Sequence, residues 1–196
     1  MRNDDVYLQL YLVRHAESMG NIETNESFDR INPPLTSHGE AQAKAAGERF
    51  AAVPLDAVYS SPLLRAEQTA REIAVRCKKD IIIDNRLLEH GIAENGDGFA
   101  DTAESDELCA ERAAEFIAFL KSNHACGSVA VVSHGEFIQF LIRAALGITL
   151  EQGIKFCIFN ASVTKINFRY GKANKLALQN DISHLAALDG DRLSWM

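Results

Sequence analysis

The sequence of 196 residues has no long apolar run, and no segment approaches the about 18–20 apolar residues that cross a bilayer. Residues 1–5 include acids where a secretory signal has its basic segment, so we expect a cytoplasmic protein. Basic residues are in the minority, because 20 Lys and Arg face 27 Asp and Glu. This acidic balance, with no polybasic segment, predicts neither nucleic acid nor a membrane surface as a partner.

Cysteine and proline are also scarce. There are four prolines, all before residue 63, and no Gly- or Pro-rich linker interrupts the rest. We therefore expect one domain over residues 1–196, long enough to bury a core without disulfides or a structural metal. The four cysteines are widely spaced, without a C-x-x-C pair, and are interpreted as reduced core thiols: Cys77, Cys109, Cys126 and Cys157.

What the sequence does have is an alternation of short apolar runs with longer helical patterns. It predicts strands at 6–13, 55–59, 81–83 and 129–132, and helices at 38–52, 62–77, 104–122 and 136–146. This order favours an α/β fold of three α/β/α layers around a mainly parallel sheet. Strand-like segments at 154–159, 162–168 and 175–178 predict an antiparallel hairpin at the sheet edge.

Basic and imidazole side chains follow three of the predicted strands. Arg14 and His15 end the first strand, Arg65 lies in the first turn after the second, and His134 follows the fourth. The carboxyl ends of parallel strands meet at one edge, where such sheets bind ligands, so we expect these four side chains to converge.

These residue types suit phosphoryl chemistry. One guanidinium group can bind two phosphoryl oxygens at once, and helix N-termini add backbone N–H donors. A neutral imidazole can attack phosphorus, while a second, protonated imidazole would offset charge on the phosphoryl oxygens. The sequence contains neither a Walker loop nor a G-x-S-x-G elbow. It therefore gives no support for an NTP-binding protein or a serine hydrolase.

Six ordered segments resemble the histidine phosphatase superfamily, which has the phosphoglycerate mutase-like fold. They span about residues 8–185, and several such segments in the same order are far more specific than any one of them. The segments are LVRHAES (12–18) with Asn21, PLTSHGEAQA (34–43), YSSPLLRA (59–66) with QTA (68–70), LLE (87–89), VSHG (132–135) and NDISHL (180–185).

The resemblance implies a role for each matching residue. His15 would be the nucleophile that becomes phosphohistidine, and Glu89 would protonate the leaving oxygen and then help water attack. His134 would take part in catalysis as well as in phosphate binding. The implied phosphate-binding residues are Arg14, Arg65, His134 and Asn21. No metal or other cofactor is implied.

The sequence departs from the family pattern after Glu89. Family phosphatases usually carry aromatic residues and Trp-Glu-Gly here, whereas this chain has HGIAENGDG, which leaves Glu94 as the alternative acid. A second, smaller departure is Ala16, where the signature usually has glycine. We expect only a short cap or insertion around residues 90–105.

Three functions are considered. The first is a metal-independent phosphomonoester hydrolase acting on a small phosphorylated metabolite or a phosphoprotein. The alternatives are phosphoglycerate mutase-type transfer and a catalytically weak phosphate-binding interaction module. The stretch from Glu89 to His134 is short for a mutase, and eight acids without Lys or Arg lie between Glu89 and Glu111. These acids either repel a second phosphate or form a solvated face, so the hydrolase is favoured.

The remaining signals concern local structure and specificity. Ser61 and Pro62 suit the N-cap and first position of a helix, and either Thr36 or Ser37, the latter in a capping box with Glu40, suits another. Specificity is expected in residues 21–32 and 91–104, and no pattern indicates an oligomeric state. Four other histidines are not assigned to the site, three as structural or surface residues and His90 without an interpretation: His38, His124, His184 and His90.

Overall fold

The centre of the protein is a six-stranded sheet. The computed structural model describes residues 5–22 and 28–189, and its strand order is β3-β2-β6-β1-β7-β8. The four strands β3, β2, β6 and β1 run parallel, β7 runs antiparallel to β1, and β8 pairs antiparallel with β7, so the sheet is mainly parallel with an antiparallel edge, as the sequence predicts. The strands are β1 (Val6–Arg14), β2 (Ala57–Ser60), β3 (Ile81–Ile83), β6 (Gly127–Ser133), β7 (Val163–Arg169) and β8 (Lys175–Asp181).

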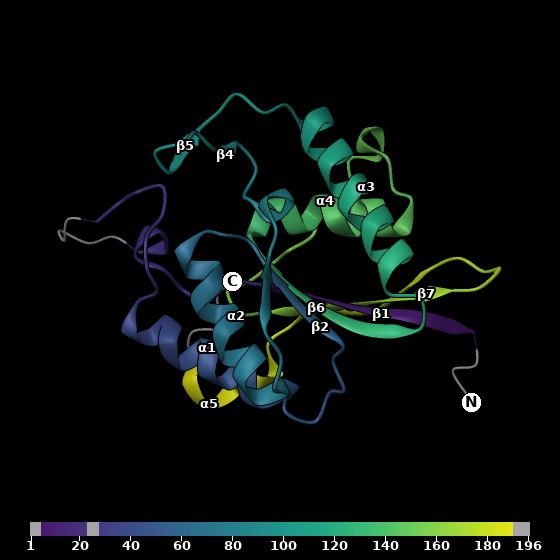
Figure 1. Ribbon diagram of the computed structural model, residues 1–196, viewed down its shortest axis with the longest axis horizontal. Coiled ribbons are helices and arrows are strands. Elements are labelled where there is room, and N and C mark those ends of the chain that lie inside the picture. The colour runs from purple at the N-terminus through teal and green to yellow at the C-terminus, as the bar shows by residue number, and fades with distance from the viewer. Residues whose placement is uncertain (1–4, 23–27, 190–196) are drawn as a thin grey trace.

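Helices cover both faces of this sheet, which gives the three expected layers. In Figure 1, α1, α2 and the short α5 lie on one face, and α3 and α4 lie on the other. The helices are α1 (Ser37–Phe50), α2 (Leu64–Cys77), α3 (Asp106–Asn123), α4 (Gly135–Leu146) and α5 (Ala186–Asp189). Single 3-10 turns lie at η1 (Met19–Asn21), η2 (Asn85–Leu87), η3 (Leu150–Gln152) and η4 (Ser183–Leu185).

Strand β6 shows why apolar and polar residues do not alternate along the buried strands. Successive side chains of a strand point to opposite faces, and here both faces are buried. Val129 and Val131 pack against α3 and α4, whereas Ala130 and Val132 pack against α2. The strand is therefore fixed from both sides, and the residues that come after it have a rigid support.

The starts of two helices differ in detail from the expectation. Thr36, and not Ser37, is the N-cap of α1, because its Oγ1 accepts a hydrogen bond from the Gly39 N–H at 2.9 Å. Helix α2 begins at Leu64 without a side-chain cap, so the expected N-cap role of Ser61 is wrong. The Ser61 hydroxyl instead lies beside the ring of His134.

The segment 154–159 is not a strand, contrary to the sequence prediction. Its backbone groups are bound by side chains instead: Phe156 N–H donates to Gln139 Oε1 at 3.1 Å, and Phe159 N–H donates to Asn180 Oδ1 at 2.7 Å. An antiparallel hairpin does lie at the sheet edge, but β7 and β8 form it, and residues 154–159 take no part in it.

A small hairpin of β4 (Ile92–Glu94) and β5 (Phe99–Asp101) was not predicted. It lies within the region where a short cap is expected. Figure 1 shows it with η1 at the end of the molecule toward which β1 runs. Part of the expected specificity region, residues 23–27, lies outside the described residues.

All four cysteines are free thiols, as expected. Only Cys109 is buried, however, and Cys126 and Cys157 are exposed, so the interpretation as core residues holds for one of them. None of the helices within the described residues has the length and hydropathy that a membrane crossing requires.

Candidate functional site

The ends of β1, β2 and β6 bring two histidines together. His15 follows β1, and its backbone N–H donates to the Ser133 carbonyl at the end of β6, at 2.9 Å. His134 follows β6 and is the N-cap of α4. The two rings lie 5.2 Å apart between centroids, and only 3% of His15 and none of His134 is exposed. Two imidazoles therefore share one buried corner at the carboxyl edge of the sheet.

The tautomer of His15 is fixed by its hydrogen bond. Nδ1 lies 2.7 Å from the Ala16 carbonyl oxygen, which can only accept, so Nδ1 carries the hydrogen and Nε2 holds the lone pair. Burial lowers the pKa of His15 well below its usual value, and the charges of Arg65 and Arg14 lower it further. At neutral pH, His15 is thus a neutral imidazole with a nucleophilic Nε2.

His134 has a hydrogen-bond partner on its other ring nitrogen. The Ser61 hydroxyl accepts from Leu63 N–H at 3.3 Å, so its own hydrogen can donate to His134 Nε2 at 2.8 Å. Nδ1 then carries the hydrogen, and it is buried without a hydrogen-bond partner. Burial also lowers the pKa of His134 well below its usual value. The lowered pKa disfavours the protonated imidazole that the sequence analysis expects, and in the tautomer in which Ser61 donates to Nε2, the Nδ1–H is an available donor in this corner.

Two guanidinium groups flank the histidines. Arg14 donates from Nη1 to the Ile158 carbonyl at 2.7 Å, and its Nε is buried without a partner. A Cβ on Gly135 would lie 3.3 Å from this Nε, so the glycine permits the close approach. Arg65 donates to the Ile31 carbonyl at 3.0 Å. Burial lowers the pKa of Arg65 to about 10, which leaves it cationic at neutral pH.

Of the two candidate acids, Glu89 belongs to this corner. Its Oε1 accepts from the N–H groups of His90 and Phe137, both at 3.0 Å, and Phe137 lies in the first turn of α4. Burial raises the pKa of Glu89, which favours its protonated form. The alternative, Glu94, is exposed and accepts from Asn85 Nδ2 at 2.6 Å. The geometry favours Glu89 as the acid.

Asn21 lies at the exposed margin of the site. Its Oδ1 accepts from the backbone N–H of Ser18 at 3.0 Å and from Asn160 Nδ2 at 3.2 Å. Asn160 also donates to the His15 carbonyl at 3.0 Å. Thr69 gives a second support, because its Oγ1 accepts from the Ala16 N–H at 3.0 Å. Asn160 was not predicted, since nothing local in the sequence indicates its contact with His15.

The sequence of this chain has counterparts among known proteins. The family model that matches is the histidine phosphatase superfamily (branch 1), over residues 10–97 and 92–181. The chain belongs to the histidine phosphatase superfamily.

Relatives of this chain carry two kinds of name. An Enterobacter protein named as a probable phosphoglycerate mutase is 30% identical, over 95% of this chain and 99% of its own length. A Schizosaccharomyces pombe protein named as a probable phosphatase is 33% identical, over 97% of this chain and 75% of its own. A solved Entamoeba histolytica phosphoserine phosphatase in complex with 3-phosphoglyceric acid shares the fold, with a TM-score of 0.69 and 23% identity over 91% of this chain and 99% of its own.

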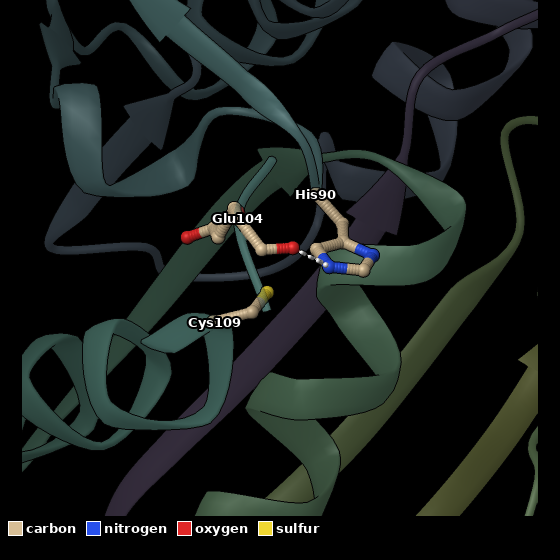
Figure 2. Close-up of side chains that lie close together, drawn as sticks. All are labelled: His90, Glu104 and Cys109. Atoms are coloured by element: carbon tan, nitrogen blue, oxygen red, sulfur yellow. Dashed lines mark hydrogen bonds between the residues drawn. The ribbon is translucent and has the colours of Figure 1, made fainter. Parts of the chain in front are cut away.

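Within the described residues, one group of side chains is close enough to hold a metal ion. The ligand atoms of His90, Glu104 and Cys109 lie within 4.8 Å of one another (Figure 2). However, Arg112 donates to both Glu104 oxygens and approaches Cys109 Sγ at 3.7 Å. Burial raises the pKa of the Cys109 thiol to about 12, and His90 Nε2 lies 3.0 Å from the Glu104 carbonyl oxygen. The atoms that could bind a metal are thus already occupied by hydrogen bonds or, at Cys109, by the thiol hydrogen. We interpret the group as an ion-pair cluster.

The two buried histidines predict one part of how the stability of this protein depends on pH. Below pH of about 6.5, unfolded histidine binds a proton that folded His15 and His134 do not, because their folded pKa values are lower. The free energy of unfolding should therefore fall as the pH drops below about 6.5, by at most about 1.4 kcal/mol per pH unit for each histidine.

Urea unfolding at several pH values between about 7.5 and about 5.5 measures this slope. The double variant His15→Asn, His134→Asn should reduce the slope, and His124 and His184, whose pKa values burial also lowers, should account for part of the slope that remains. An equal slope in the double variant would show that these imidazoles are not kept neutral by the fold.

Proposed function

We propose that the protein is a phosphomonoester hydrolase that works through a phosphohistidine on His15 and needs no metal ion. The observation that carries this proposal is the pairing of a neutral, nucleophilic Nε2 on His15 with unpartnered buried donors on Arg14 and His134. Buried donors without partners are rare, and a phosphoryl group would supply the missing acceptor oxygens. Arg65 adds a second cation beside them.

In the first step, His15 Nε2 attacks phosphorus, the bond from phosphorus to the ester oxygen breaks, and Glu89 gives that oxygen its proton. In the second step, water loses a proton to Glu89 and attacks phosphorus, and the phosphorus–nitrogen bond breaks. Inorganic phosphate leaves, and His15 and Glu89 return to their starting states. Arg14, Arg65 and His134 would stabilise the charge on the non-reacting oxygens in both steps.

The proposed substrate is a small phosphorylated metabolite or a phosphoprotein. Mutase-type transfer is the second candidate, supported by the mutase name of a relative with 30% identity. Hydrolysis is favoured because a mutase must hold a second phosphate away from water. Here the region after Glu89 forms only the β4–β5 hairpin, and most of its acids are exposed.

The shared sheet supports a single domain, and the four free thiols support a cytoplasmic, reducing location.

Hydrolysis is tested with para-nitrophenyl phosphate in the presence of EDTA. We expect full activity and a phosphoenzyme that is trapped by rapid quenching in alkali but lost in acid, as a phosphorus–nitrogen bond requires. Activity that disappears with EDTA would contradict the metal-free route. Stabilisation by phosphate in a thermal melt without any turnover would favour the binding-module alternative.

The same protein separates hydrolase from mutase. It is incubated with 3-phosphoglycerate and a trace of 2,3-bisphosphoglycerate, and released phosphate is compared with 2-phosphoglycerate formed. The hydrolase assignment is overturned if isomerisation exceeds phosphate release.

A further inference from the structure

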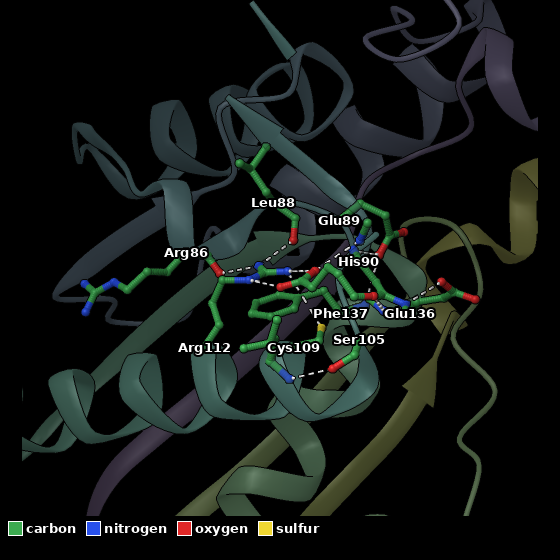
Figure 3. Close-up of polar contacts among 12 residues, drawn as sticks. Arg86, Leu88, Glu89, His90, Ser105, Cys109, Arg112, Glu136 and Phe137 are labelled. Carbon is green, nitrogen blue, oxygen red and sulfur yellow. Dashed lines mark hydrogen bonds and ion pairs between the residues drawn. The ribbon is translucent and has the colours of Figure 1, made fainter. Parts of the chain in front are cut away.

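A largely shielded arginine lies next to the segment that carries Glu89. Arg112, on α3, donates from Nη1 to the carbonyl oxygens of Arg86 and Leu88, both at 2.9 Å. Figure 3 shows its guanidinium pointing into the turn that leads to Glu89. The backbone immediately before the proposed acid is therefore fixed by one side chain.

The other edge of the same guanidinium fixes the backbone after Glu89. Nε and Nη2 donate to Glu104 Oε1 and Oε2 at 2.9 and 2.7 Å, and Glu104 Oε2 accepts from the Gly91 N–H at 3.0 Å. The ion pair is mostly shielded from water, with 19% of the Arg112 side chain and 15% of the Glu104 side chain exposed. One ion pair thus binds the chain on both sides of Glu89.

Arg112 also contacts the residue that binds the Glu89 carboxylate. Its guanidinium lies over the ring of Phe137, 4.1 Å from the centroid, and the Phe137 N–H donates to Glu89 Oε1. The backbone and the carboxylate of Glu89 therefore both depend on groups that Arg112 contacts. A planar fork of five donors suits this set of acceptors, and a lysine could not satisfy it.

We propose that Arg112, through its ion pair with Glu104, is the positioning residue that aims the Glu89 carboxyl at the leaving oxygen. This inference rests on the proposed function, in which Glu89 is the general acid. A general acid must lie within hydrogen-bond reach of the oxygen that it protonates. A small displacement of the turn should therefore slow proton transfer more than it slows attack by His15.

The test compares two substrates of similar shape, phenyl phosphate and para-nitrophenyl phosphate. Nitrophenolate leaves readily without a proton, whereas phenolate needs one. The readout is kcat/KM, which reports phosphoryl transfer to His15 and not the later attack of water that both esters share. In Arg112→Met we expect kcat/KM for phenyl phosphate to fall roughly 10- to 100-fold and kcat/KM for the nitrophenyl ester to fall less than about 3-fold. Glu89→Gln should show the same selectivity more strongly, and Arg112→Lys should lie between Arg112→Met and the wild type.

Glu104→Gln is the second arm, because it removes the charge of the ion pair and keeps the side-chain shape. Its phenyl phosphate defect should not add to that of Arg112→Met, since both act through one contact. Arg49→Met is the matched control: Arg49 pairs with Asp181 at 2.5 Å, both side chains are 21% exposed, and the pair lies outside the site. It should change neither rate.

The outcomes separate this inference from the proposed function. Equal losses on the two esters in Arg112→Met, or no loss, would overturn the positioning role while hydrolysis through His15 stands. A thermal melt of each variant distinguishes unfolding, which would reduce both rates together. Absence of leaving-group selectivity in Glu89→Gln would overturn both the assignment of the acid and the role of Arg112.

Discussion

Replacing His15 with alanine should lower kcat for para-nitrophenyl phosphate by roughly 10⁴- to 10⁶-fold, because the variant has no atom that can accept the phosphoryl group. The phosphate-binding groups would remain, so substrate should still bind. The phosphoenzyme trapped from the wild type should be absent. Steady-state kinetics and alkaline-quench labelling measure the two effects.

His124→Asn is the control for this loss. His124 ends α3 and precedes β6, so it lies at the opposite end of the strand from His134, where its Nε2 is 2.9 Å from the Tyr59 hydroxyl. We expect near-normal activity in that variant. Retention of more than about a tenth of the rate in His15→Ala would show that another group is the nucleophile.

Replacing Arg65 with methionine should lower kcat/KM roughly 10²- to 10³-fold, because the substitution removes a fixed cation that contacts the transferring phosphoryl group in a shielded site. Only 7% of Arg65 is exposed. The variant should also bind orthovanadate more weakly, since vanadate mimics the five-coordinate phosphorus. Because Arg65 helps to lower the pKa of His15, that pKa should rise in the variant.

Arg71→Met provides the comparison on the same helix. Its side chain is 65% exposed and pairs with Glu67 one turn earlier, an arrangement that contributes little in water. Rate and vanadate affinity should be unchanged. Comparable losses in Arg65→Met and Arg71→Met would indicate an effect of net charge rather than a contact with phosphate.

The sequence predicts most of the sheet because the pattern there is local. An unbroken apolar strand such as β6 must be buried on both faces, and the residues at its C-terminal end must lie at the carboxyl edge of the sheet. The same pattern predicts that Arg14, His15, Arg65 and His134 share one edge. It also explains why the family resemblance is concentrated at strand ends.

The features that the sequence does not predict depend on distant partners. Residues 154–159 have the composition of a strand, but Gln139 and Asn180 take hydrogen bonds that a neighbouring strand would otherwise make. Likewise, Arg112 stands in an ordinary helical pattern, and its partners lie in an irregular segment whose course has no sequence signature. The prediction for Ser61 is wrong because a hydroxyl before a proline suits a helix cap as well as it suits His134.

The position of β1 has a consequence for how the protein is made. This strand is synthesised before the other strands of the sheet, yet its neighbours in the sheet, β6 and β7, lie far later in the sequence, at Gly127–Ser133 and Val163–Arg169. The segment that carries Arg14 and His15 is likewise held by the carbonyl of Ile158 and the side-chain amide of Asn160. Synthesis must therefore pass β6 before β1 can pair, and folding depends on contacts of long sequence separation, which form slowly. A nascent chain halted before β7 would contain every proposed phosphate-binding residue and yet have no assembled site.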